Sequence, residues 1–234
     1  MTSHSVTSFA KEDLLEYLSE NGVGVHRGAF VPDLLPPAGV QTSVVMVLES
    51  PHANELASRL PVSGKAGRDA LSFLIDEGAA ASALGPFVRE FNFNTDGDGI
   101  AIVNVSRVPL ERTAFDYPAT TPELPREAWE MLDRLRKSAP QDVRAIRDAM
   151  RREVAQLLLG SFEKRMTSLC LSCAATVVLA GKFAQLYWSS LGVKPAARSL
   201  NVPHPSYGQW SPTAASADAS LTELRRVFLA LTGY

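Results

Sequence analysis

The chain has 234 residues, of which 46% are hydrophobic and 21% charged, and its formal net charge is −2. This length and composition fit one globular domain covering residues 1–234. The longest apolar runs, such as 44–48 and 174–180, are far shorter than the roughly 20 residues of a membrane-spanning helix. The polar start lacks a signal peptide's apolar stretch, so we expect a soluble, cytoplasmic monomer with no membrane partner.

The first half of the chain predicts a helix and two strands. Residues 1–40 should form an N-terminal helix, at 9–20, and a proline-rich loop, at 31–39. Residues 43–48 are a continuous apolar and β-branched run, typical of a strand buried on both faces. A second strand is expected at 100–105. The helical segments between these strands are 70–75 and 87–91.

The second half adds a long helical region and two more strands. Residues 122–173 are charged and mostly helical in pattern, with a break at 138–140, and we interpret them as an insertion. Strands and helices then alternate, as in a parallel sheet. The strands are 176–180 and 199–202, and the helices are 183–190 and about 214–231.

This order predicts a three-layer α/β/α sandwich with a central four-stranded parallel sheet. In such sheets ligands bind beyond the carboxyl ends of the strands. Glu49, Asn104, Gly181 and His204 all stand at those ends. We therefore expect them to share one site.

Charge is distributed unevenly along the chain. Residues 1–103 carry 6 Lys/Arg against 13 Asp/Glu, while residues 104–210 carry 15 against 10. A basic face for nucleic acid and an ordinary solvated helix surface both fit this pattern. Charge alone favours the solvated surface.

The two cysteines, Cys170 and Cys173, are too few for a disulfide framework. A CxxC pair can supply half of a zinc or iron–sulfur site, but there is no second pair and the four histidines are scattered. We interpret both cysteines as small buried residues packed within one helix. No metal or cofactor is expected.

Residues 63–71, SGKAGRDAL, contain a Gly-Lys pair that invites a phosphate-loop interpretation. That motif needs a glycine where Arg59 stands and a Ser or Thr where Ala66 stands, so an ATP- or GTP-binding loop is rejected. A glycine-rich turn opening a helix could still hold a DNA phosphate, helped by Lys65 and Arg68.

Neither Ser50 nor Ser206 has the GxSxG context of a serine hydrolase, so that class is disfavoured. Glu49 is a stronger candidate, because carboxylates rarely adjoin buried apolar runs without a partner or a task. A helix cap or a salt bridge is its structural alternative. His204, between two prolines, is either catalytic or a structural histidine.

Four groups of short motifs lie at the ends of the predicted strands. They are VVMVLESPH (44–52) with LPVSGKAGRDAL (60–71), IAIVNVSRVPL (100–110), VVLAGKFA (177–184) and NVPHPS (201–206). Together they resemble the motifs of the uracil-DNA glycosylase superfamily. The resemblance implies the three-layer fold, DNA as the partner, and hydrolysis of the bond that joins a base to deoxyribose.

The resemblance also implies roles for individual residues, acting on a nucleotide flipped out of the duplex. Glu49 would orient water and stabilise an oxocarbenium-like sugar, and His204 would donate to O2 of the base. Asn104 would recognise the pyrimidine edge, because its amide offers both a donor and an acceptor. No lysine matches a Schiff-base nucleophile, so we expect simple hydrolysis that leaves an abasic site.

Further base and DNA contacts follow from the same family positions. The base pocket would include Pro51, His52 and Val62. DNA would be contacted by Ser63, Lys65, Arg68, Lys182 and Ser206. A wedge inserted into the base stack would come from Tyr207, Gln209 or Trp210, for which surface packing is the alternative.

Three departures from the family bear on this interpretation. Val62 stands where uracil enzymes carry a stacking phenylalanine, and His52 where they carry a tyrosine that excludes 5-substituted pyrimidines. Leu48 replaces a family glycine, which affects the local backbone. The iron–sulfur branches need four cysteines, so a cluster is not expected.

The departures at Val62 and His52 favour a bulkier modified pyrimidine slightly over uracil. Some branches of the superfamily remove glucosylated hydroxymethylcytosine from phage DNA, in defence. The alternatives are a uracil-DNA glycosylase of base-excision repair and a catalytically inactive nucleic-acid-binding module on the same fold.

Overall fold

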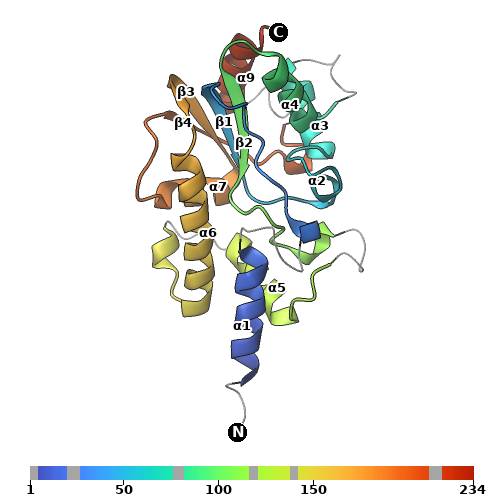
Figure 1. Ribbon diagram of the computed structural model, residues 1–234, viewed down its shortest axis with the longest axis vertical. Coiled ribbons are helices and arrows are strands. Elements are labelled where there is room, and N and C mark those ends of the chain that lie inside the picture. Colours follow the sequence, from blue (N-terminus) through green and yellow to red (C-terminus); the bar gives the residue numbers. More distant parts are fainter. Residues whose placement is uncertain (1–4, 20–26, 76–81, 116–120, 138–141, 211–217) are drawn as a thin grey trace.

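The computed structural model describes residues 5–19, 27–75, 82–115, 121–137, 142–210 and 218–234. Four parallel strands form its central sheet in the order β2-β1-β3-β4 (Figure 1). The strands are β1 (Thr42–Leu48), β2 (Gly99–Asn104), β3 (Leu171–Ala180) and β4 (Arg198–Val202). The predicted four-stranded parallel sheet is confirmed.

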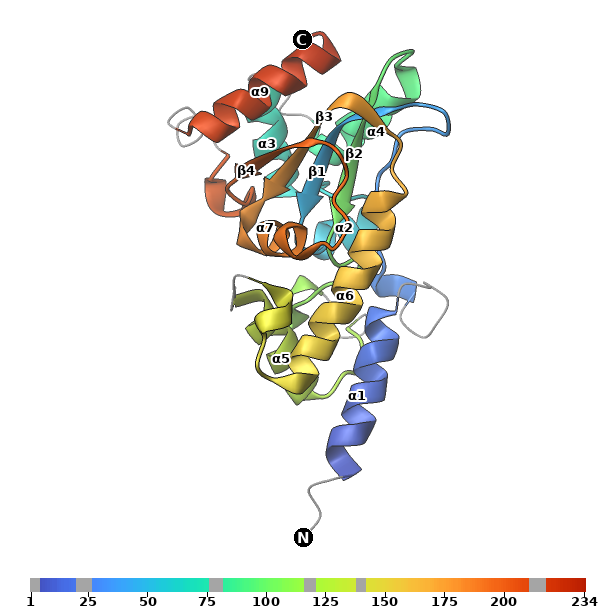
Figure 2. The same ribbon diagram turned by 90° about the vertical axis from the view of Figure 1, so that its left-hand side faces the viewer.

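Helices cover both faces of the sheet, which makes a three-layer sandwich (Figure 2). One face carries α3 (Lys65–Ile75), α4 (Leu84–Asn94) and α9 (Ala219–Thr232). The other carries α6 (Ala149–Thr167) and α7 (Gly181–Ser190). No helix within the described ranges is long and apolar enough to span a bilayer.

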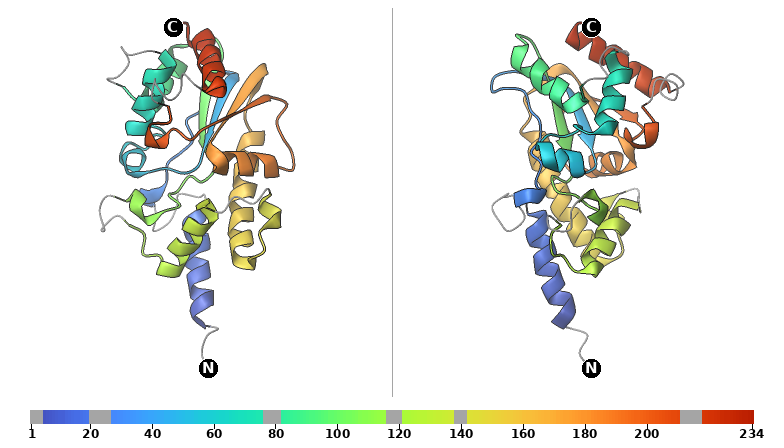
Figure 3. Two further views of the ribbon diagram at one scale, coloured as in Figure 1. Left: turned by 180° about the vertical axis from the view of Figure 1, so that it is seen from behind. Right: turned by 90° about the vertical axis from the view of Figure 1, so that its right-hand side faces the viewer.

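The remaining helices lie around the carboxyl ends of the strands and beyond them. Figure 3 shows α1 and α5 packed with α6 in a helical region on this side of the sheet. The longer of these elements are α1 (Ser5–Leu18), α2 (Ala53–Ser58) and α5 (Arg126–Lys137). Short 3-10 turns occur at Arg27–Ala29, Arg112–Ala114, Val143–Ala145 and Ser206–Gly208.

The alternation of side chains along β1 explains the two apolar cores. Val45 and Val47 point to the face covered by α6 and α7, and Val44, Met46 and Leu48 point to the face covered by α3, α4 and α9. Because both faces are buried, the strand is apolar from Val44 to Leu48 rather than alternating. The predicted doubly buried strand is confirmed.

The cysteine prediction is wrong. Cys173 lies in β3 and Cys170 just before it, and both side chains are exposed rather than packed inside a helix. The register of β3 against β1 shifts between Leu171 and Thr176, and β4 pairs with β3 only from Thr176 onward. The first part of β3 therefore lacks the neighbouring strands that flank its later residues on both sides.

Several predicted helix bounds also shift. The first helix occupies Ser5–Leu18 instead of 9–20, and the last begins at Ala219. The helix α6 ends at Thr167, so the residues up to 173 are not all helical. The predicted break at 138–140 and residues 214–217 lie outside the described residues.

A buried ion pair anchors the end of β2. Arg165, in the last turn of α6, donates from Nη1 to both carboxylate oxygens of Asp33, at 2.9 and 3.0 Å. The same guanidinium donates to the backbone carbonyls of Asn104 and Val105, at 2.9 and 2.8 Å. The backbone carrying Asn104 is therefore held by a helix that follows it by about sixty residues.

Removing Asp33 should strongly destabilise the protein. The Asp33 and Arg165 side chains are only 7% and 11% exposed, so Asp33→Ala removes a buried carboxylate that accepts two hydrogen bonds from a buried guanidinium. We expect the free energy of unfolding to fall by roughly 3–5 kcal/mol. Urea unfolding measures this loss. The control is Glu130→Ala, which breaks the exposed Arg126–Glu130 pair and should lower the free energy of unfolding by no more than about 1 kcal/mol. Equal losses in the two variants would contradict the assignment.

Candidate active site at the carboxyl end of the sheet

The four strand ends bring the predicted site residues to one edge of the sheet. Glu49 follows β1, Asn104 ends β2, Gly181 follows β3 and His204 lies just beyond β4. The N–H of Ser106 donates to the carbonyl of Glu49 at 3.0 Å, which joins the chain beyond β2 to that beyond β1.

Gly181 allows the loop after β4 to approach the end of β3. It has a φ of +88°, and a Cβ placed on it would lie 3.0 Å from Cβ of His204. Both the backbone conformation and the contact favour glycine here. His204 is therefore seated directly against the start of α7.

A pocket of about 310 Å³ opens at this edge. Of the predicted residues, His52, Val62, Lys65, His204 and Ser206 line it. This volume lies near the lower end of the range of small-molecule sites.

Glu49 and Asn104 do not line this pocket but adjoin it. Glu49 stands in sequence between two lining residues, Leu48 and Ser50, and Asn104 pairs with Leu48 in the sheet. Asn104 is 2% exposed, and its Oδ1 has no hydrogen-bond partner among the described residues. A buried acceptor without a donor is costly, which is typical of a group kept for a ligand.

The environment of His204 keeps its imidazole neutral. Burial, the largest cause, and electrostatic repulsion from His52 and Arg136 together lower its pKa from 6.5 to about 4. The Ser206 N–H donates to Nδ1 at 3.2 Å, so the ring proton of the neutral form resides on Nε2. His204 therefore offers the pocket an N–H donor.

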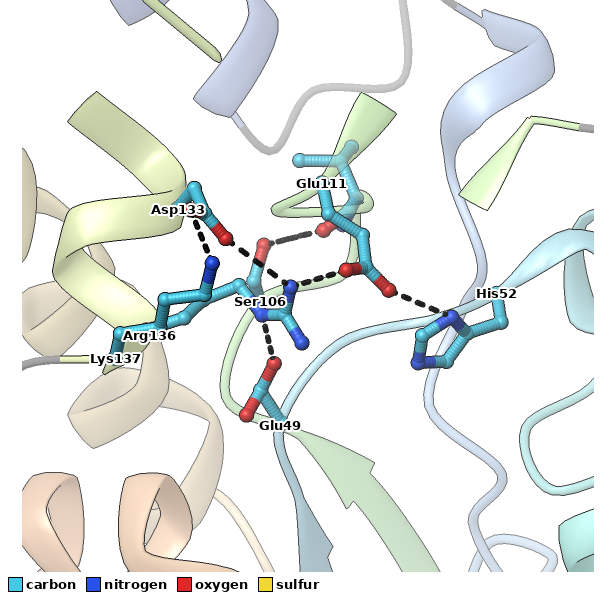
Figure 4. Close-up of polar contacts among 8 residues, drawn as sticks. Glu49, His52, Ser106, Glu111, Asp133, Arg136 and Lys137 are labelled. Carbon is cyan, nitrogen blue, oxygen red and sulfur yellow. Dashed lines mark hydrogen bonds and ion pairs between the residues drawn. The ribbon is translucent and has the colours of Figure 1, made fainter. Parts of the chain in front are cut away.

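Glu49 belongs to a charged chain that the sequence did not reveal. Arg136 of α5 donates from Nε to Oε1 of Glu49 and from Nη1 to Oε2 of Glu111 (Figure 4). His52 Nδ1 lies 3.2 Å from Oε1 of Glu111. Burial opposes the charge on Arg136, but the carboxylates of Glu49 and Glu111 outweigh it and raise its pKa.

Glu49 therefore forms a salt bridge, which was the structural alternative to a catalytic role. A salt bridge and a catalytic role for Glu49 are compatible. No local pattern distinguishes Arg136 from its neighbours Arg134 and Lys137 in the last turn of α5, so only packing identifies it.

A second missed residue, Glu55, shapes the pocket wall. Its buried carboxylate accepts the N–H of Val62 at 2.6 Å and that of His52 at 2.8 Å, and burial raises its pKa. Val62 has a φ of +48°, which a β-branched residue rarely adopts. Glu55 stands three residues after the N-cap His52, which is the capping-box spacing, but His52 replaces the usual Ser or Thr, so the sequence signal was incomplete.

The predicted DNA-contacting residues lie in different environments. Lys65 is exposed and pairs with Asp69 at 2.7 Å, while Ser63 Oγ lies 2.6 Å from Ser58 Oγ. Arg68, Lys182 and Gln209 are exposed, and Pro51 is buried.

Of the three wedge candidates, Trp210 is excluded. It is buried in the core with α3 and α9, and its indole N–H donates to the Pro203 carbonyl at 2.8 Å. This corrects the prediction for Trp210, since a residue that completes the core cannot insert into DNA. Gln209 remains, and the side chain of Tyr207 lies outside what the structure describes.

No protein-family model matches the chain, and no curated protein matches it either. The resemblance to uracil-DNA glycosylases therefore rests on the motifs quoted above.

Gly67→Ala should damage the pocket wall. A Cβ on Gly67 would lie 1.8 Å from the carbonyl oxygen of Val62, a backbone atom that cannot step aside. We expect a loss of about 1–3 kcal/mol of unfolding free energy from overpacking. Gly160→Ala in α6, where a Cβ meets nothing within 4 Å, should instead gain about 1 kcal/mol. Thermal or urea unfolding of both variants checks the opposite signs.

His204 should remain neutral well below the ordinary histidine range. Between pH 6.5 and about 4 the unfolded chain binds a proton that the folded chain does not, so this contribution to stability is lost as pH falls through that window. NMR titration of the His204 ring, assigned with His204→Gln, should give a midpoint near 4. The wild-type stability should also lose more than that of His204→Gln on acidification. A midpoint near 6.5 would contradict the proposed environment.

Proposed function

We propose that this protein is a DNA glycosylase that hydrolyses the N-glycosidic bond of a flipped-out pyrimidine nucleotide. The observation that carries the proposal is a carboxylate, Glu49, next in sequence to two lining residues of a pocket that is also lined by a neutral imidazole donor, His204. Breaking this bond develops positive charge on the sugar and negative charge on the base. A carboxylate and an N–H donor stabilise these opposite charges.

The proposed reaction is a simple hydrolysis. The bond between C1′ and the base nitrogen breaks, and its electron pair goes to the base, whose O2 accepts a hydrogen bond from Nε2 of His204. The oxygen of a water held by Glu49 bonds to C1′, and the water proton passes to the carboxylate. The departing base takes up a proton from solvent, and an abasic site remains.

Recognition of the base would depend on Asn104. Its buried Oδ1 can accept a base N–H, and such a ligand would supply the partner that this oxygen lacks among the described residues. Val62 and His52 line the pocket in place of the phenylalanine and tyrosine of uracil enzymes. The aliphatic wall and the partly exposed imidazole favour a modified pyrimidine, including phage-type glucosylated hydroxymethylcytosine, slightly over uracil.

DNA would lie across the pocket mouth. Ser206 lines the pocket and Lys65 reaches its rim, so both suit a flanking phosphate, with Arg68 and Lys182 as further exposed cations. Gln209 and Tyr207 are the candidates for the wedge. Phage defence and DNA repair are both consistent with this activity.

A second candidate is a nucleic-acid-binding module without catalysis. The ion pair of Glu49 with Arg136 favours it, because a paired carboxylate also serves a structural role. Both candidates require DNA binding, so they differ in base release alone.

Base release should depend on both proposed catalytic residues. The protein is incubated with uracil-containing, hypermodified phage and unmodified DNA, and abasic sites are counted. Glu49→Gln should lower the rate about 10²–10⁴-fold, and His204→Ala about 10²–10³-fold, because each removes charge stabilisation in the transition state. Glu90→Gln, on the exposed surface of α4, is the matched control and should keep the wild-type rate.

The three DNAs separate the alternatives. Abasic sites in phage DNA support the enlarged pocket, and abasic sites in uracil DNA alone identify a uracil enzyme. DNA binding without abasic sites in any of them establishes the binding module.

A further inference from the structure

We propose that Arg136 is a positioning residue for this reaction. It fixes Glu49 by one carboxylate oxygen and leaves the other for the attacking water, while Glu111 holds the far end of the guanidinium. The inference rests on the proposed glycosylase function, whose site it extends into the helical region.

The contacts are specific to an arginine. Nε of Arg136 reaches Oε1 of Glu49, and Nη1 reaches Oε2 of Glu111 (Figure 4). A planar guanidinium presents these donors at fixed angles, whereas a lysine offers a single point charge. Oε2 of Glu49 accepts no hydrogen bond from any residue of the described ranges. One oxygen is thus committed and one remains available.

The helix that carries Arg136 is itself fixed in place. The side chains of Trp129, Leu132 and Leu135 bury one face of α5 in the core shared with α1 and α6. Arg136 follows directly in the last turn, 87 residues beyond Glu49 in the chain. Packing of α5 therefore determines where Glu49 is held.

Arg136 is shared between two carboxylates. Its guanidinium faces Glu49 and Glu111, and the imidazole of His52 also faces Glu111, at 3.2 Å. Because Arg136 is shared, it orients Glu49 without serving as the exclusive counter-ion of that carboxylate. Glu49 therefore keeps negative charge that can stabilise a developing oxocarbenium ion.

A DNA-phosphate contact is the competing role for an arginine beside such a pocket. The side chain of Arg136 is 19% exposed, compared with 86% for Arg126 at the start of the same helix. Two donor nitrogens of Arg136 already contact carboxylates. These observations favour positioning. Phosphate binding predicts a different set of measurements, so the two roles are separable.

The test compares Arg136→Gln, Arg136→Lys and the surface control Arg126→Gln in single-turnover base release and in DNA binding at several salt concentrations. Arg136→Gln should slow release from bound DNA about 10²-fold, the effect of a misplaced reacting group. Its affinity for DNA and the salt slope should match wild type. Arg136→Lys should fall between the two, and Arg126→Gln should match wild type.

A double variant tests whether Arg136 acts through Glu49. If it does, Glu49→Gln with Arg136→Gln releases base no more slowly than Glu49→Gln alone, since the losses of coupled residues do not add. Glu111→Gln, which removes the negative charge that holds the far end of the guanidinium, should slow release in the same direction by a smaller factor. If circular dichroism shows that Arg136→Gln does not fold, Glu111→Gln tests the positioning role in its place.

Other outcomes overturn the proposal. An unchanged release rate in folded Arg136→Gln or, if that variant does not fold, in Glu111→Gln excludes positioning. An affinity loss with the salt slope reduced by about 1, and a normal rate once bound, assigns Arg136 to a phosphate instead. If the wild type releases no base from any of the three DNAs, the glycosylase function fails and this role fails with it. If the wild type releases base, the rates of the variants test the role of Arg136 alone.

Discussion

The parallel pairing of β1 with β2 on one side and with β3 on the other determines where the strand-end residues Glu49, Asn104 and Gly181 lie. Backbone hydrogen bonds align Leu48 with Asn104 and Val47 with Leu179, so the strands finish at a common edge. Apolar residues fill both faces of β1, and its first polar side chain after Leu48 is Glu49, at the edge where the strand leaves the sheet. The site is a consequence of where the buried strands end.

Most buried charge near this edge is compensated within the protein. Arg165 has Asp33 and two backbone carbonyls, Glu55 accepts two backbone N–H groups, and Arg136 contacts two carboxylates. Oδ1 of Asn104 is a buried neutral acceptor to which the described residues offer no donor. Such a group calls for an explanation, and a ligand that donates a hydrogen bond would supply one.

The helical region contributes to the site as well as to the core. The helix α5 supplies Arg136 and the end of α6 supplies Arg165, and each contacts the end of a different strand. In sequence these arginines belong to a charged, mostly helical stretch that resembles any solvated surface. Their burial at the sheet edge converts part of that stretch into support for Glu49 and for the backbone of Asn104.

The sequence by itself determined the strands, their parallel arrangement and the gathering of Glu49, Asn104 and His204, because uninterrupted apolar runs ending in polar residues are local patterns. It misplaced Cys170 and Cys173, whose small neighbours give no strand signal, and Trp210, whose burial depends on distant helices. Only the tertiary structure decided that Arg136, Glu111 and Glu55 join the site. Contacts across 87 residues for Glu49 and Arg136 depend on how α5 packs, and no spacing within the chain encodes that packing.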